Sequence, residues 1–231
     1  MFALETDGEC NDNNLYRIIG VIPTQSSENG EYENRVKLIK ANVLGYKYWS
    51  GSDNNQSNDW TKSTLNTKIL NEEYWNSINK YQKYIEDSKW YLASSPYNVK
   101  TNEFYENERG NTINNDRPVS WIGKIGLMYP SDYGYAVGGV NRTTCLEMKV
   151  GQYNTNDCYT NDWLFIGYEW TLNPVENYLD SIIILANGSS TINLVHVATN
   201  AYRPVFYLNS LVLLKSGSGQ KNDPYRITFN E

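Results

Sequence analysis

The end of the chain carries the three motifs that decide the fold: WTLNP at residues 170–174, YRPVFYLNS at 202–210 and SGSGQKNDPYRI at 216–227. Their aromatic and β-branched residues are typical of strands, and their Pro, Gly and Asn residues are typical of turns. Between residues 175 and 201 the side chains follow no clean period, and aliphatic residues stand where a half-buried strand would carry polar ones. A regular framework around an irregular insert is the arrangement that a recognition surface needs.

Size and charge exclude several classes of protein. No Pro/Gly/Ser linker divides the 231 residues, so we expect a single domain over residues 1–231. The net charge of -6 is spread along the chain without a Lys/Arg cluster, which argues against nucleic acid as a partner. No run approaches the roughly 20 apolar residues of a membrane span, so we expect no direct membrane insertion. The start, MFALETDGEC, lacks the basic and apolar regions of a signal peptide, so an export signal or anchor is expected to lie outside this sequence.

The composition is rich in tyrosine and small polar residues. The chain has 20 Tyr, 7 Trp and 16 Gly, with abundant Asn and Ser. Tyr, Ser, Gly and Asn are typical of antibody-type binding surfaces. An AT-rich genome also raises the share of Asn and Tyr, so composition alone does not decide between these explanations.

Three cysteines allow one disulfide. Cys145 and Cys158 flank a polar loop and could close it, which would contribute on the order of 3 kcal/mol for a loop of this length. Cys10 would then have no cysteine in this sequence to pair with. The alternative is three free thiols, and no CxxC or Cys/His metal spacing competes with the disulfide.

The first part of the chain predicts a hairpin. Residues 15–22 and 35–41 are two β-rich runs on either side of a turn at NGEYEN. In the second run we expect Val36 and Leu38 on the inner face and Lys37 outside. A loop is expected over residues 50–59.

A helix follows this loop. Ser63 or Thr64 can cap it. A second short helix is expected within residues 81–91, and residues 93–120 are polar and predict a long excursion without regular structure. Apolar side chains recur at helical spacing in the first helix: Leu65, Ile69, Leu70, Tyr74 and Ile78.

The second half is β-rich. Residues 123–129 predict a buried strand, and the runs 181–186 and 190–198 flank Asn-Gly, the strongest short hairpin signal. A strand over 202–208 and a short final strand close the chain. Strands, one or two helices, long loops and then a strand cluster predict an α+β fold with mainly antiparallel pairing.

Both faces of the predicted hairpin carry apolar residues. Ile182, Ile184 and Ala186 share one face. The other face holds Ile183, Leu185, Ile192, Leu194 and His196. Either this is a central strand pair buried on both sides, or one face belongs to the core and the other is a partly exposed patch that contacts a partner.

The sequence gives little support for catalysis or for metal binding. His196 is the only histidine, and no Cys or Ser has the local signature of a nucleophile. No calcium-binding or phosphate-binding motif is present, so we expect no metal and no cofactor. Trp163 and Trp170 are expected in the core. Arg203 precedes a proline and is expected at the edge or start of a strand.

These motifs, in this order, resemble a family of surface-associated proteins from gut Firmicutes. The matching segments are YRIIGV, RVKLIK, KIGLMYPSDYGYA, TTCL…C…NDWL, WTLNP, YRPVFYL and GSGQKNDPYRI. In that family a C-type-lectin-like domain often follows a pilin-like N-terminal anchor. Similar domains are the variable proteins of diversity-generating retroelements, in which a reverse transcriptase mutates adenines in one C-terminal cassette that ends at an Arg-Pro strand.

The resemblance implies a C-type-lectin-like fold: a twisted antiparallel sheet, termini close together, and ligand-facing residues on the later strands and loops. It implies a variable cassette over residues 171–204 that ends at Arg203 and Pro204. Adenine mutation scatters Asn codons into residues of the kinds found here. The candidate binding residues are Val175, Glu176, Asn177, Tyr178, Ile183, Leu185, Asn187, Thr191, Asn193, Val195, His196 and Thr199.

The expected function is ligand binding or adhesion outside the cell or at its surface. The partner would be a protein or glycan on another cell, a phage or a host surface, and specificity would come from complementarity and not from a reaction. Two alternatives stay open. One is a structural pilus or appendage subunit that packs through Ile183 and Leu185, and the other is a degenerate enzyme on the same scaffold.

Overall fold

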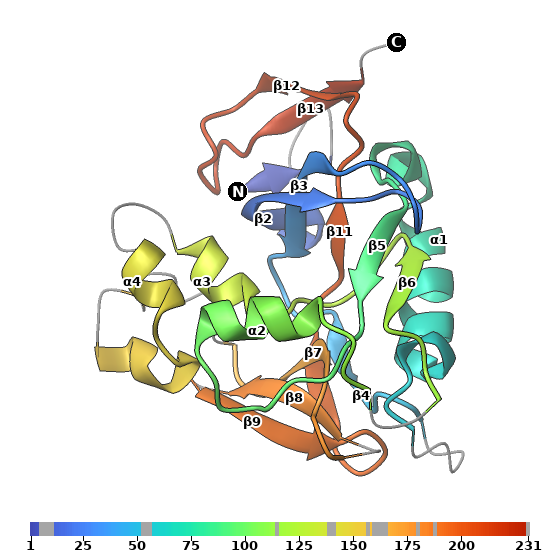
Figure 1. Ribbon diagram of the computed structural model, residues 1–231. Coiled ribbons are helices and arrows are strands. Elements are labelled where there is room, and N and C mark those ends of the chain that lie inside the picture. Colours follow the sequence, from blue (N-terminus) through green and yellow to red (C-terminus); the bar gives the residue numbers. More distant parts are fainter. Residues whose placement is uncertain are drawn as a thin grey trace.

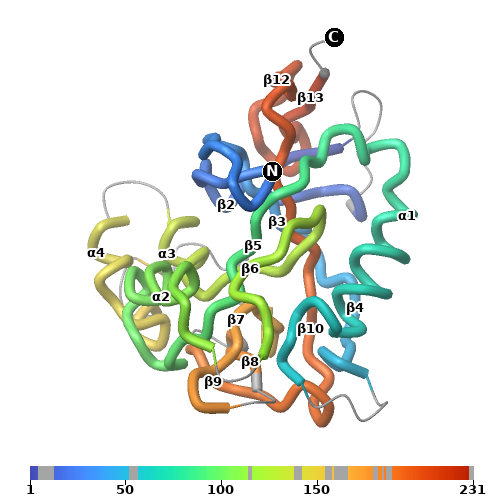
Figure 2. Tube along the Cα trace, turned by 45° about the vertical axis from the view of Figure 1, so that its right-hand side comes forward, coloured from blue at the N-terminus to red at the C-terminus, as the bar shows by residue number. Residues whose placement is uncertain are grey.

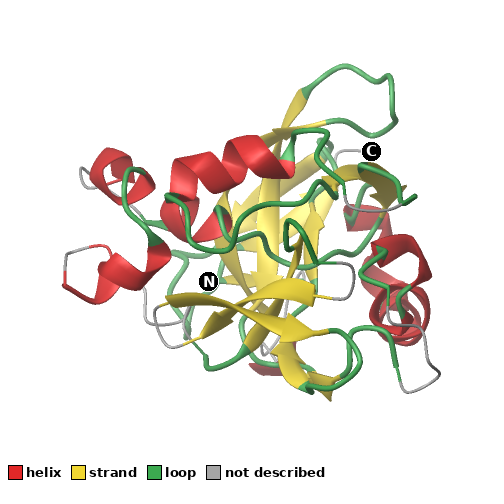
Figure 3. Cartoon of the chain, turned by 60° about the horizontal axis from the view of Figure 1, so that its bottom comes forward, coloured by secondary structure: helices red, strands yellow, loops and turns green. Residues whose placement is uncertain are grey.

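Two mainly antiparallel sheets form the centre of the molecule, with helices on either side of them (Figures 1 and 3). The structure is a computed structural model, which describes residues 1–4, 12–51, 57–113, 116–137, 142–155, 158, 166–178, 181–186 and 189–229. Among these residues helices are few and antiparallel pairing predominates, so the predicted α+β class is confirmed.

The first sheet has the strand order β1-β2-β3-β11. Strands β2 and β3 pair from Tyr16–Lys40 to Thr24–Glu33, which confirms the predicted opening hairpin. Strand β11 pairs with the other edge of β3, although it is far away in the sequence. The bounds are β1 (Phe2–Ala3), β2 (Leu15–Thr24), β3 (Glu33–Lys40) and β11 (Val205–Tyr207).

The faces of β3 differ from the prediction. Lys37 is fully buried and Val36 is half-buried, so the expectation of Lys37 outside was wrong. The strand lies between β2 and β11, and both of its faces are covered along its second half. Burial of the Lys37 ammonium is possible because Asp132 approaches it to 2.7 Å.

The second sheet has the strand order β4-β10-β7-β8-β9. Ala186 pairs with Ser189 and Ile183 pairs with Ile192, which confirms the predicted hairpin and its register. Asn187 and Gly188, the expected turn, lie outside the described residues. The bounds are β4 (Gly45–Lys47), β7 (Glu169–Pro174), β8 (Ser181–Ala186), β9 (Ser189–Leu194) and β10 (Asn200–Tyr202).

Arg203 and Pro204 carry the chain from one sheet to the other. The predicted strand over 202–208 is therefore divided into β10 and β11, and Arg203 stands just before β11, at the expected start of a strand. Proline cannot donate a hydrogen bond to a ladder, and its carbonyl instead accepts one from the Lys40 N–H at 3.0 Å.

The helices lie on the two sides of the sheets (Figure 3). The predicted helix begins after Ser63, whose hydroxyl accepts a hydrogen bond from the Asn66 N–H at 3.1 Å and acts as the cap. All five of its predicted apolar residues are buried. The bounds are η1 (Asp12–Asn14), η2 (Trp60–Lys62), η3 (Leu65–Tyr74), α1 (Trp75–Ser77), η4 (Asn79–Tyr84), α2 (Thr101–Glu108), α3 (Asp132–Ala136), α4 (Arg142–Leu146) and η6 (Val150–Thr155).

Three predicted segments differ in part. The second short helix is the 3-10 helix η4, and the chain after it forms the strand β5 (Ser88–Tyr91), which pairs with β6 (Ser120–Gly123). The polar excursion over 93–120 contains the helix α2, which we did not predict. The segment 123–129 is buried beyond Lys124, but after Gly123, which ends β6, its strand pairing is limited to a bridge between Gly126 and Val205.

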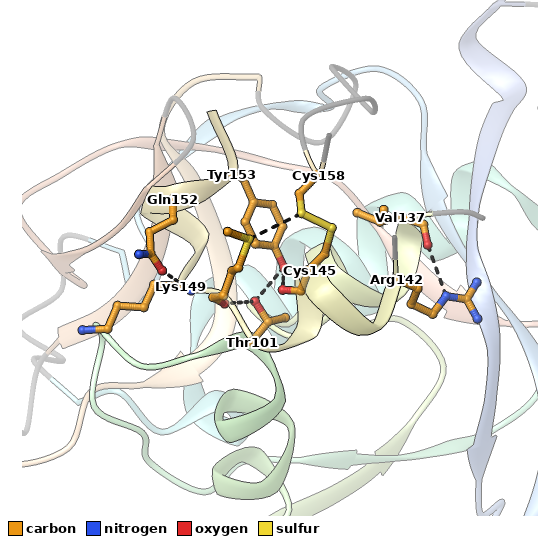
Figure 4. The surroundings of a disulfide bond; sticks show 9 residues. Thr101, Val137, Arg142, Cys145, Lys149, Gln152, Tyr153 and Cys158 are labelled. Atoms are coloured by element: carbon orange, nitrogen blue, oxygen red, sulfur yellow. Dashed lines mark hydrogen bonds between the residues drawn. A yellow bond between two sulfur atoms is a disulfide. The ribbon is translucent and has the colours of Figure 1, made fainter. Parts of the chain in front are cut away.

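The predicted disulfide is confirmed. Cys145 and Cys158 are joined across 13 positions in the sequence. Tyr153 lies beside the disulfide (Figure 4), where its hydroxyl donates to the Cys145 carbonyl at 2.8 Å and lies 2.7 Å from the Thr101 hydroxyl. The disulfide therefore closes the α4–η6 segment, and the Thr101 hydroxyl holds that segment at the start of α2.

The two ends of the described chain meet. The Ala3 N–H donates to the Tyr225 carbonyl at 2.9 Å, so β1 lies beside the C-terminal hairpin of β12 (Val212–Ser216) and β13 (Arg226–Phe229), as Figure 2 shows. A single cluster of buried side chains extends from Phe2 to Ile227. Trp170 belongs to this core as predicted, and its ring centre lies 5.9 Å from that of Trp49. Trp163 lies outside the described residues. None of the helices in the described ranges is long and apolar enough to cross a membrane.

Candidate binding surface

The turn after β7 is held against the polar excursion. The Ser95 N–H donates to the Pro174 carbonyl at 3.1 Å, and the Glu176 N–H donates to the Ser95 carbonyl at 2.9 Å. The Asn107 side chain of α2 donates to the Ser95 hydroxyl at 3.1 Å. These bonds join two segments that are about 80 residues apart in the sequence into one fixed piece of backbone.

A cavity of about 560 Å³ opens between these two segments. Tyr97 and Tyr178 are 42% and 46% exposed, and Glu176 is half-buried. Asn177 has a φ of 66°, in the left-handed region that asparagine tolerates better than most residues. The lining residues are Pro96, Tyr97, Val175, Glu176, Asn177 and Tyr178, and we call them the tyrosine pocket.

The tyrosine pocket contains four of the predicted binding residues and two that we did not predict. Pro96 and Tyr97 belong to the excursion, and nothing in the local sequence links them to the turn after β7. The available signal was an aromatic residue in a polar segment, since tyrosine has an apolar ring and a polar tip suited to binding sites. On the other side of the pocket, the Asn58 side chain donates to the Tyr178 carbonyl at 3.1 Å.

Four further predicted residues that are not fully buried lie on β9 and the connection after it. Thr191, Asn193 and His196 are half-buried, and Thr199 is exposed. The Asn193 side chain donates to the Asn200 side-chain oxygen at 3.1 Å, so part of it is already engaged inside the molecule. The backbone of this connection is fixed because the Trp49 N–H donates to the Val195 carbonyl at 3.0 Å.

Four predicted binding residues are buried, and their assignment to an exposed face was wrong. Val175 is 1% exposed, and Ile183, Leu185 and Val195 are 0% exposed. Strand β8 lies between β7 and β9, and successive residues Ile182 and Ile183, which point to opposite faces, are both buried. The alternative of burial on both sides is therefore correct for Ile182 and Ile183 of β8, whereas the edge strand β9 reaches solvent.

The polar excursion explains part of this burial. Ser190 shares a sheet face with Leu185, and its hydroxyl donates to the Tyr97 carbonyl at 2.6 Å. The excursion therefore passes over the face that we expected to be exposed. The segment η6 also contacts β9. Asn187 lies outside the described residues.

Other exposed aromatic and aliphatic side chains belong to the second sheet and its connections. Tyr46 of β4 is 64% exposed, Tyr168 before β7 is 56% exposed, and Val197 is 61% exposed. Tyr46 pairs with Ala201, and the Ala201 N–H donates to the Tyr168 carbonyl at 2.9 Å, so the backbone of both tyrosines adjoins β10. Tyr46 and Tyr168 lie outside the predicted cassette of residues 171–204, and Val197 lies within it but was not among the predicted binding residues.

The side chains at this surface can make non-covalent contacts with a ligand. Phenol hydroxyls and the Asn177 amide can donate and accept hydrogen bonds, the Glu176 carboxylate accepts them, and the tyrosine rings supply apolar area. Within the described parts of the chain, no group of three or more His, Cys, Asp or Glu side chains is arranged to hold a metal ion.

Comparison of the chain with protein-family models, with curated proteins and with solved structures finds no match. The class of the protein therefore follows from its structure alone: the described residues form an α+β protein with mostly antiparallel sheets and few helices.

Proposed function

We propose that this chain is an extracellular ligand-binding or adhesion domain that presents the tyrosine pocket and the exposed part of β9 to a partner on another surface. The observation that carries the proposal is the pocket itself. Tyr97, Glu176 and Tyr178 surround a cavity whose two walls are joined by backbone hydrogen bonds. The partner is a protein or a glycan.

The physical argument rests on preorganisation. A tyrosine offers a large contact area and loses little conformational freedom when it binds. The backbone that carries Tyr178 and Glu176 is continuous with β7, whose residues are all buried. Binding therefore does not have to order this part of the chain, and that ordering would otherwise weaken the affinity.

We further propose a C-type-lectin-like fold and a place among the variable proteins of diversity-generating retroelements. The support is the resemblance of the motifs together with the distribution of burial. The framework residues Trp170, Leu172 and Arg203 are fully buried, and exposed residues lie between them. Within residues 171–204 the tolerant set would be Glu176, Asn177, Tyr178, Thr191, Asn193, His196 and Thr199.

The binding proposal is tested with labelled protein on a glycan array and on whole bacterial cells. We expect the wild-type domain to bind a limited set of targets and Y97A/Y178A to lose most of that binding. The matched control is Tyr32→Ala, since Tyr32 is 62% exposed at the β2–β3 turn. Equal loss in Y32A and Y97A/Y178A, or wild-type binding that the pocket variant retains, would contradict the assignment of the pocket.

The diversification proposal is tested by sequencing the gene from many sibling isolates. Adenine-derived substitutions should gather in codons of the seven positions above, which are exposed or half-buried. The codons of Val175, Ile183, Leu185 and Val195 should stay unchanged or encode only aliphatic residues, because these side chains fill the core. Substitutions spread evenly along the chain would contradict it.

A second candidate function is that of an appendage subunit, and the C-terminal hairpin favours it. Leu213 and Leu214 of β12 are 47% and 64% exposed, beside an apolar groove of about 270 Å³. The earlier expectation of packing through Ile183 and Leu185 no longer applies, because both are buried. Sedimentation at rising protein concentration separates the two functions, since a subunit would self-associate through β12 and L214E would abolish that association.

A further inference from the structure

A lysine and an aspartate meet deep inside the molecule. The Lys37 Nζ lies 2.9 Å from Oδ1 and 2.7 Å from Oδ2 of Asp132. The two side chains are 1% and 4% exposed. Lys37 is on the central strand β3, and Asp132 is the first residue of α3, so the pair joins two elements that are 95 residues apart.

Aromatic rings surround the ammonium group. Nζ lies 4.3 Å from the ring centre of Tyr129, 5.5 Å from that of Tyr207 and 5.6 Å from that of Trp90. These rings exclude water from the pair. Burial lowers the pKa of Lys37, although the Asp132 carboxylate acts in the opposite direction.

Other charged groups are near the pair. Glu108 accepts a hydrogen bond from the Ser131 N–H at 3.1 Å, beside Asp132 in the chain, and Arg109 contacts Glu108 at 3.3 Å. Asp132 itself accepts a second hydrogen bond, from the Tyr129 N–H at 2.7 Å. The carboxyl group is thus held on both sides, with its carbon next to the lysine nitrogen.

This geometry brings a nucleophile and an electrophile together. In a dry site a proton can pass along the short hydrogen bond from Nζ to the carboxylate, which replaces two buried charges by a neutral amine and a neutral carboxylic acid. A neutral amine is the form that attacks a carbonyl carbon. Fixed intramolecular neighbours react as if each were present at about 10⁵–10⁸ M.

We propose that Lys37 and Asp132 form an intramolecular amide bond in the folded protein. The bond between Nζ and the Asp132 carboxyl carbon forms, and one carbon–oxygen bond of that carboxyl group breaks. The departing oxygen takes two protons from Nζ and leaves as water. The two opposite charges disappear together, and the step needs no oxidant, reductant or co-reactant.

The amide bond would change the mechanics of the molecule. It would connect the first sheet covalently to α3, and the disulfide at Cys145 and Cys158 would fix the segment that follows α3. A neutral amide also removes the desolvation cost of a buried ion pair. A covalent connection of this kind would hold a surface domain together under load, whatever ligand the domain binds.

The decisive measurement is the intact mass of the folded, purified and reduced wild-type chain. We expect a mass one water molecule below that of the sequence. K37R and D132A should have their full sequence masses, since arginine does not form the amide and alanine has no carboxyl group. D132N should form the same bond with loss of ammonia.

A peptide map then locates the bond. Trypsin should fail to cleave after Lys37, and the peptide that contains Lys37 should be joined to the one that contains Asp132. A wild-type chain that keeps its full mass after long incubation at mildly acidic and mildly alkaline pH overturns the proposal. Loss of water at any other pair of residues overturns it equally. The wild-type mass decides the question even if a variant fails to fold.

Discussion

Arg203 and Glu169 form a bidentate ion pair inside the second sheet. Arg203 Nε lies 2.8 Å from Oε1, and Nη2 lies 2.8 Å from Oε2 of Glu169. The side chains are 0% and 1% exposed. The pair stands where the chain leaves β10 for β11, so it fixes the corner between the two sheets.

Loss of one partner of this pair should be strongly destabilising. We expect Arg203→Met to lower the free energy of unfolding by about 3–5 kcal/mol, because it leaves the Glu169 carboxylate buried without its cation. The double variant R203M/E169L should recover most of that loss. Urea unfolding measures both.

An exposed ion pair provides the control. Lys100 and Glu147 are 44% and 56% exposed and 3.0 Å apart, so Lys100→Ala should change the unfolding free energy far less than Arg203→Met does. Equal effects of R203M and K100A would show that burial does not set the strength of the pair.

Glu108 should make stability depend on pH. Burial raises the pKa of Glu108 from 4.5 to about 7, so the folded protein holds this proton more tightly than the unfolded chain does. Its contribution is therefore fully present below about pH 4.5 and is lost as the pH rises through about 7. The loss is at most about 3 kcal/mol.

Glu108→Gln tests this dependence. The amide stays neutral and its oxygen can still accept the hydrogen bond from the Ser131 N–H. We expect the unfolding free energy of E108Q to fall less than that of the wild type between mildly acidic and mildly alkaline pH. Glu147→Gln, which removes a carboxylate at an exposed site, is the matched control. An unaltered pH profile in E108Q would contradict the prediction.

At the scale of elements, local sequence predicted what neighbouring residues determine. Asn187-Gly188 predicted the β8–β9 register, and Ser63 predicted the start of η3, because turns and caps depend on a few adjacent residues. Lys37 was placed on the wrong face because alternation assumes a strand with one wet face. In β3 the second face is covered by parts of the chain about 95 residues away.

The two strands of the hairpin should respond differently to truncation. Ile183→Ala on β8 should lower the free energy of unfolding by about 2–5 kcal/mol, since it leaves a cavity in a fully buried site. Leu194→Ala on β9 should cost much less, because Leu194 is 40% exposed. Urea unfolding of both variants checks this. Equal costs would show that β9 is more buried than the structure indicates.

The disulfide should stabilise the α4–η6 segment in particular. C145S/C158S should lose about 3 kcal/mol of unfolding free energy, given the 13-residue separation of the two cysteines. Hydrogen exchange should accelerate near Tyr153, which bonds to the Cys145 carbonyl, before it accelerates in β2 and β3. Unchanged exchange at Tyr153 would mean that its packing alone holds this segment.

At the scale of the whole molecule, the sequence could not show which face of the hairpin would be covered. The excursion that passes over Leu185 is polar, and its contact depends on one hydrogen bond from Ser190 to a backbone carbonyl. Every residue has a backbone carbonyl, so this contact cannot be recognised from the amino-acid sequence. The same reason hid Tyr97, which joins Tyr178 only through the bonds between Ser95 and the turn after β7.

The division of the cassette into buried and exposed positions should govern which substitutions the fold accepts. Two surface-displayed libraries of variants test this, and the quantity compared is the fraction of variants that stay folded through heating and protease treatment. One varies Val175, Ile183, Leu185 and Val195. The other varies the seven exposed or half-buried positions of the tolerant set. Truncations in the first cost about 2–5 kcal/mol each, out of a total stability of about 5–15 kcal/mol, so most members should unfold.

Most members of the second library should survive, because surface substitutions usually change stability by less than about 0.5 kcal/mol. Two positions should be less tolerant than the others for stated reasons. Asn177 has a φ of 66°, so glycine should replace it better than valine does, and Asn193 donates a hydrogen bond to Asn200. If both libraries survive equally, burial does not constrain the cassette. If the exposed library also unfolds, those side chains hold the fold together and are not free to serve a changing partner.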